Sequence, residues 1–150
     1  MPNGRTHKVV GAVVGGGAAL VKSAGQPAGC RALETAGGVL AGVGLGMLPD
    51  VIEPALHPGH RSLAHGAAPA VVLGSLVAQH LDSWQASLRA RAEQQATLAM
   101  QSQSQLAHLW HAFLELLFRL LAGAVAGGFG GYGSHLALDA FTRRGLPLIA

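Results

Sequence analysis

The sequence predicts an all-α protein, a compact bundle of about four to five helices rich in glycine and alanine, in a single domain. The chain has 150 residues, which is the usual size of one domain. Half of its residues (50%) are hydrophobic, 22 are glycine and only 11% are charged, whereas an ordinary soluble domain has about 25% charged residues. The apolar runs lack the strict alternation and the enrichment in β-branched residues that are typical of strands, so helices are expected.

Four helical segments follow from the pattern of apolar runs and helix breakers. The first is expected near Lys8–Ala24 and the second near Ala32–Leu48, where Pro49 stops it. The third begins at Ala64 or Pro69, runs to Leu81, and is able to continue through a polar section to Met100. A Gln/Ser spacer at 101–105 precedes the last region, 106–141, in which a break at the glycine cluster 127–133 stays open.

A proline-rich loop is predicted between the second and third helices. The stretch Leu48–His65 contains three prolines, one glycine, two acidic residues and three histidines. Such a composition does not suit a regular element, but it concentrates side chains that bind metals. We therefore expect this loop to carry ligands.

Composition leaves two environments open, a bilayer and water. The uncharged runs Ser62–Leu81 and Leu120–Leu138 approach the roughly 20 residues of a membrane-spanning helix. Both contain histidine, and the first also contains Pro69. The N-terminal run after Lys8 is similar to a signal peptide, but no convincing cleavage site follows, so we expect a retained helix.

Two classes of site are disfavoured by the basic and sulfur-containing residues. Ten Lys and Arg against seven Asp and Glu give a net charge of +3, but the basic residues are scattered along the chain, so no nucleic-acid partner is expected. Cys30 is the single cysteine, which excludes an internal disulfide and thiolate metal clusters. Ligands with oxygen and imidazole nitrogen remain.

Histidine is the unusual feature of the composition, because eight occur in 150 residues. His135 and Asp139 are four residues apart and so lie on one face of a helix, where they either share a metal ion or form a polar patch. Asp50, Glu53 and three histidines crowd the proline-rich loop. Because unpaired buried ionisable groups are costly, a divalent cation is favoured, with Zn²⁺ first and Mn²⁺ or Fe²⁺ as alternatives.

Four ordered segments carry a resemblance to a known family. They are THK at Thr6–Lys8, LPD at Leu48–Asp50, HRSLAHG at His60–Gly66 and GYGSHLALDAFTRRGLPLI at Gly131–Ile149. Together they resemble the YdjM-like family of bacterial membrane-bound, metal-dependent hydrolases. That family is in turn distantly similar to the zinc-dependent phospholipase C and zinc nuclease superfamily. The chain departs from the family pattern at Ile52, where a second Asp is usual, and at Ala64, where Thr is usual.

The resemblance implies a set of site residues. Its candidate metal ligands are His7, Asp50, His60, His65, His135 and Asp139. Its candidate catalytic residues are Glu53 and His60 as proton acceptors, a role also open to His7, and Arg61 to neutralise a phosphate oxygen or to pair with an acid. The other histidines, His57, His80, His108 and His111, are expected to have loop, capping or interfacial roles.

We therefore expect a metal-dependent hydrolase that acts on a phosphoester, with a small molecule or a lipid as substrate. The alternative is a non-catalytic membrane or assembly module in which the same cluster is a structural metal clip. The resemblance implies a location at a bacterial inner membrane, with a cytoplasmic bundle as the alternative. A homo-oligomer stays open.

Overall fold

The structure, a computed structural model, describes residues 4–52 and 67–141 and confirms the all-α prediction. In that part of the chain it contains five α-helices and no strand. The helices are α1 (Gly4–Lys22), α2 (Ala28–Leu45), α3 (Leu48–Ile52), α4 (Ala67–Gln101) and α5 (Gln105–Ala140). The predicted proline-rich loop beyond Ile52 lies outside the described residues.

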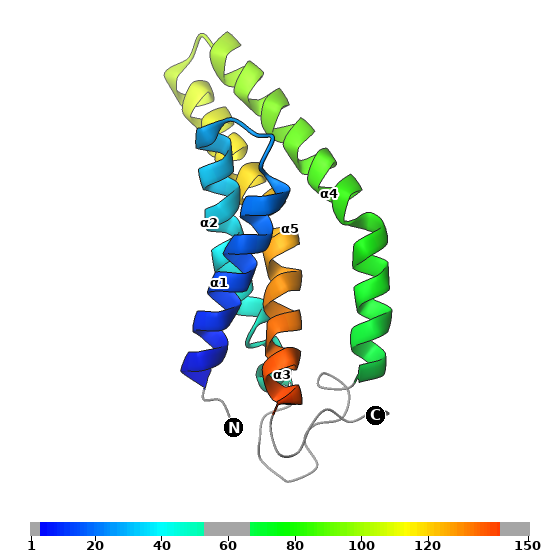
Figure 1. The fold of residues 1–150 in the computed structure, drawn as a ribbon. Coiled ribbons are helices and arrows are strands. Elements are labelled where there is room, and N and C mark those ends of the chain that lie inside the picture. Colours follow the sequence, from blue (N-terminus) through cyan, green and yellow to red (C-terminus); the bar gives the residue numbers. More distant parts are fainter. Residues whose placement is uncertain (1–3, 53–66, 142–150) are drawn as a thin grey trace.

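Three helices, α1, α2 and α5, form the central bundle, and α4 packs along α5 (Figure 1). The start of α1, the short helix α3 and the last turns of α5 lie at one end of this bundle. At the other end, α4 and α5 form a helical hairpin that extends beyond α1 and α2, while the first half of α4 diverges from α5. One end of the bundle therefore gathers residues from three separate segments of the chain.

Glycines at intervals of four residues bring the backbones of α1, α2 and α5 into contact. A Cβ added to Gly15 of α1 would lie 2.7 Å from Gly42 Cα and 2.8 Å from Gly127 O. A Cβ added to Gly131 of α5 would lie 2.6 Å from Gly42 Cα. Real Cβ atoms do not approach backbone atoms this closely, so only glycine permits the observed packing.

The residues buried between these helices are small or polar, and the large apolar side chains face outward. Among the described residues the buried apolar side chains are those of five alanines, two of them on α4, and of Leu136. Many larger side chains are exposed, including Val13 (69%) and Leu40 (68%). The largest fully buried side chains include His135, Glu34 and Asp139. This distribution is the reverse of the one usual in water-soluble proteins.

Within residues 4–52 and 67–141, two helical segments are long and apolar enough to cross a membrane, judged by length and composition. They are Ala28–Ile52 and Gln105–Ala140, and only 28% and 33% of their most apolar windows are buried inside the bundle. The helices at the centre of a soluble protein would be mostly buried.

Several predicted boundaries were wrong. The second helix begins at Ala28 rather than Ala32 and ends at Leu45, with Gly46 as its C-cap residue. Pro49 does not stop that helix. It lies in the first turn of α3, where a backbone N–H has no partner within the helix, so a proline costs no hydrogen bond. The last helix is continuous through the glycines 127–133, since they pack against α2 and α1 instead of interrupting α5.

Candidate metal centre

Four polar side chains from three helices meet at the end of the bundle where α3 lies. They are His7 from the first turn of α1, Asp50 from α3, and His135 and Asp139 from the last turns of α5. Each of them is four residues away from a buried residue in a series with this spacing; His135, for example, follows Gly127 and Gly131. The close packing of the backbones therefore also brings these side chains together.

His135 is held in one orientation. Its Nδ1 donates a hydrogen bond to the carbonyl oxygen of Gly46 at 2.7 Å, and its side chain is fully buried. Gly46 lies just after α2, where a carbonyl lacks the usual helical partner. Because Nδ1 carries the proton, the lone pair of the neutral ring is on Nε2, which faces the two carboxylates.

Three contacts between a nitrogen and an oxygen of the cluster are longer than hydrogen bonds. His135 Nε2 lies 3.6 Å from Asp139 Oδ2 and 3.7 Å from Asp50 Oδ1. His7 Nε2 lies 3.8 Å from Asp139 Oδ1. Hydrogen bonds between nitrogen and oxygen are about 2.7–3.2 Å long. At these three contacts the groups are thus close neighbours at ion-pair distance.

His7 is buried against His135. The two rings are stacked with their centroids 4.0 Å apart, and His7 is only 3% exposed. Its Nδ1 is buried and makes no hydrogen bond within the described part of the chain. A buried imidazole normally has a partner for each polar atom, so this nitrogen is a site where a ligand would be stabilising.

The spacing of these groups fits one divalent ion. One candidate ligand atom from each of His7, His135 and Asp139 lies within 4.8 Å of the other two. Two ligands of a tetrahedral Zn²⁺ with bonds of about 2.0–2.1 Å are about 3.4 Å apart. The nitrogen–oxygen separations of 3.6–3.8 Å are longer than this and involve different oxygens of Asp139, so binding of one ion requires the side chains to move closer together. The Asp50 side chain is 40% exposed, which places the solvent side of the cluster at α3.

The structure thus brings together four of the six candidate ligands. The other two, His60 and His65, lie outside the described residues, and so do the candidate catalytic residues Glu53 and Arg61 and the loop residue His57. Two further histidines make local contacts: His108 Nδ1 lies 2.9 Å from Ala99 O, and His111 Nδ1 lies 2.7 Å from Gln95 Oε1. His80 stacks on Trp84, with the ring centroids 5.7 Å apart.

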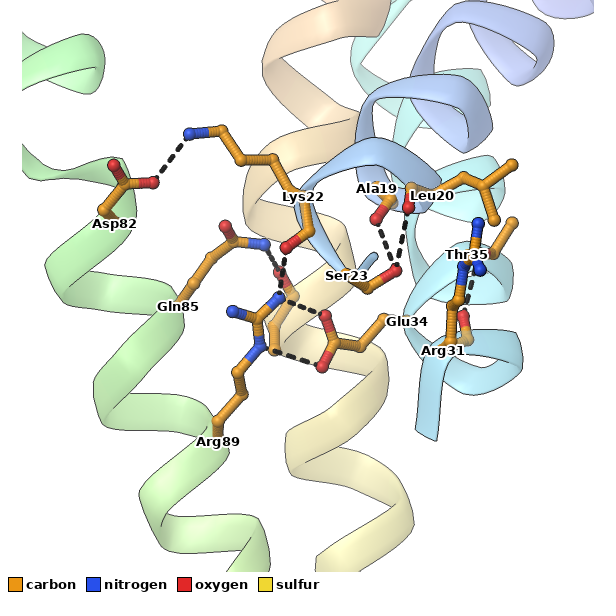
Figure 2. A network of polar contacts seen from close by, with 11 residues as sticks. Ala19, Leu20, Lys22, Ser23, Arg31, Glu34, Thr35, Asp82, Gln85 and Arg89 are labelled. Carbon is orange, nitrogen blue, oxygen red and sulfur yellow. Dashed lines mark hydrogen bonds and ion pairs between the residues drawn. The ribbon is translucent and has the colours of Figure 1, made fainter. Parts of the chain in front are cut away.

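A second polar cluster, at the point where α4 meets the central bundle, was not predicted. Glu34 of α2 is fully buried and accepts hydrogen bonds from Arg89 Nε (2.9 Å) and Nη2 (2.6 Å) (Figure 2). Arg89 also donates to Lys22 O, and Gln85 donates to Ala122 O. The hydrogen bonds to Glu34 raise the pKa of the Arg89 guanidinium further, so this side chain stays charged. These contacts fasten α4 to α1, α2 and α5.

Comparisons with known proteins leave the chain without an assigned relative. A scan against models of protein families, a search of curated proteins and a search of solved structures found no match.

Proposed function

We propose that this protein is a membrane-embedded, metal-dependent hydrolase that cleaves a phosphoester. The observation that carries the proposal is the convergence of two imidazoles and two carboxylates, in which one candidate ligand atom from each of His7, His135 and Asp139 lies within 4.8 Å of the other two, as ligands of one ion would. Ionisable groups buried among apolar helices are costly unless they pair with one another or serve a ligand or a reaction.

The residues of the chain have distinct roles in this proposal. His7, His135 and Asp139 hold a divalent cation, with Zn²⁺ preferred and Mn²⁺ or Fe²⁺ as alternatives. Gly46 O fixes the tautomer of His135, and Asp50, which is partly exposed, borders the open side. A bound ion of this kind lowers the pKa of its water and polarises a phosphoryl oxygen.

The proposal also assigns roles to residues that lie outside the described part of the chain. Glu53 and His60 are proposed as proton acceptors, His65 as a further ligand and Arg61 as the group that neutralises a phosphate oxygen. Two features support these roles: the position of Asp50 beside His135, and the resemblance to the YdjM-like hydrolases. The choice of a phosphoester depends on that resemblance, and so does the proposed location at a bacterial inner membrane.

The outward-facing apolar side chains support the membrane part of the proposal. We expect the protein to stay in the membrane pellet after extraction with alkaline carbonate and to be released by detergent. The physical reason is that valines and leucines on α1 and α2, such as Val13 and Leu40, face outward and would lie in lipid. Recovery of most of the protein in the carbonate supernatant would contradict it.

The metal is tested on the purified wild-type protein. Elemental analysis is expected to find about one divalent ion per chain. Removal of that ion with a chelator should abolish hydrolysis of bis-p-nitrophenyl phosphate, and addition of Zn²⁺ or Mn²⁺ should restore it. Absence of a stoichiometric ion, or turnover unchanged by the chelator, would contradict the proposal. If removal of the ion unfolds the chain and the loaded protein has no turnover, the cluster is a structural clip.

A further inference from the structure

A pocket of about 280 Å³ lies between α4 and α5, with its floor at α2 and α3. Leu45, Leu48, Val77, Trp84, Phe129 and Tyr132 are among its walls. The lining is almost wholly carbon, and its size is near the lower end of the range for small-molecule sites. A polar ligand would lose its hydrogen bonds in such a pocket, so the occupant must be apolar over most of its length.

The pocket adjoins the candidate metal centre. Leu48 is two residues before Asp50 in α3, and Tyr132 is one turn before His135 in α5. Trp84 also lines the pocket and is 46% exposed, so an exposed side chain borders the pocket. A molecule in this pocket would contact α4 and α5, and two of its neighbours, Leu48 and Tyr132, lie within one helical turn of Asp50 and His135.

Polar contacts attach the middle of α4 to the bundle. They are made by Asp82, Gln85 and Arg89 (Figure 2). Earlier in α4 the neighbour is apolar: a Cβ added to Gly74 would lie 3.5 Å from the Phe129 ring, an ordinary van der Waals distance. The first half of α4 thus diverges from α5 while its middle is held in place (Figure 1).

We propose that this pocket receives an alkyl chain of a membrane lipid whose phosphate-containing headgroup lies at the His/Asp cluster. The identity of the headgroup rests on the proposed function; the alkyl chain rests on the pocket and on the apolar exterior. Transfer of an alkyl chain from a bilayer into an apolar pocket changes its free energy little, because both surroundings are hydrocarbon. The pocket therefore selects lipids by the shape of their alkyl chain, and the bound chain orients the headgroup.

Photolabelling and hydrolysis of a lipid test this proposal on the full chain in detergent micelles with Zn²⁺. The probe is phosphatidic acid with a diazirine in its acyl chain, and the label is expected to concentrate on Val77, Val125 and Phe129. Ala124→Phe, which fills the pocket, should reduce labelling at these positions at least about tenfold. The ratio of hydrolysis of dioleoyl phosphatidic acid to hydrolysis of p-nitrophenyl phosphate should fall by a similar factor.

Ala36→Phe is the matched control, because Ala36 is exposed on α2 and lines a separate hollow beside Arg31. If Ala124→Phe does not fold, Val77→Phe narrows the same pocket from α4. Labels spread over outward positions such as Val13 without enrichment in the pocket, or equal effects of the two Ala→Phe variants, would overturn the proposal. Enrichment in the pocket without metal or turnover would support the lipid site and refute the hydrolase.

Discussion

Asp139→Asn is expected to weaken binding of the divalent ion by about 100-fold or more and to abolish metal-dependent turnover. The substitution keeps the size and one oxygen of the side chain but removes the negative charge. Asp139 is 1% exposed and is the carboxylate that neighbours both histidines, at 3.8 Å from His7 Nε2 and 3.6 Å from His135 Nε2. Titration with Zn²⁺ followed by isothermal calorimetry measures the loss of affinity.

The matched control for this prediction is Asp82→Asn. Asp82 is exposed on α4, where it pairs with Lys22 at 2.7 Å, so the same chemical change is made outside the cluster. We expect its metal content and turnover to equal those of the wild type. A second matched pair is His135→Ala and His80→Ala. His80 is exposed and its ring stacks on Trp84, so its removal makes the same chemical change outside the cluster. Full metal content in Asp139→Asn would refute the proposed ligand set.

The fold class could be predicted because it depends on features that are local in sequence. Long apolar runs without strand periodicity predicted helices, and each long helix is present. Boundaries near glycine and proline were less predictable, because their effect depends on their neighbours. The glycines at 127–133 suggested a break in the last helix, yet contact with α2 and α1 keeps α5 continuous.

The candidate site was partly predictable for the same reason. The interval between His135 and Asp139 places them on one helical face in any context. The approach of His7 and Asp50 to that face depends on packing between distant segments, and composition alone does not contain it. The family resemblance groups these residues as candidate ligands. In the structure, His7 lies 3.8 Å from Asp139 and Asp50 lies 3.7 Å from His135.

Glu34 and Arg89 were missed, although a signal for the first was present. Counting back from Asp50 in steps of four passes Gly46, Gly42 and Gly38 and reaches Glu34. A charged residue in register with buried glycines is expected to face the helix interface and to need a partner. The identity of the partner, Arg89, could not be predicted, since it comes from α4 and depends on how that helix crosses the bundle.

Gly127→Ala is expected to disrupt the bundle, whereas Gly133→Ala in the same helix should leave it intact or stabilise it. A Cβ at Gly127 would overlap the backbone of Gly38, and a Cβ has no rotamer by which to avoid a backbone atom. Overpacking of this kind costs about 1–3 kcal/mol where side chains yield, and we expect at least the upper value here. A Cβ at Gly133 would meet nothing within 4 Å, so alanine adds only its helix propensity, up to about 1 kcal/mol.

Thermal unfolding of the two variants in the same detergent measures the difference, and the two substitutions should move the midpoint in opposite directions. Metal content gives a second measurement. The backbone contact of Gly127 with α2 and the placement of His135 beside Gly46 belong to one interface, so Gly127→Ala should also weaken metal binding although it touches no ligand. Equal midpoints and equal metal content in both variants would mean that α2 and α5 are not in backbone contact, and the geometry of the His/Asp cluster would then lose its physical basis.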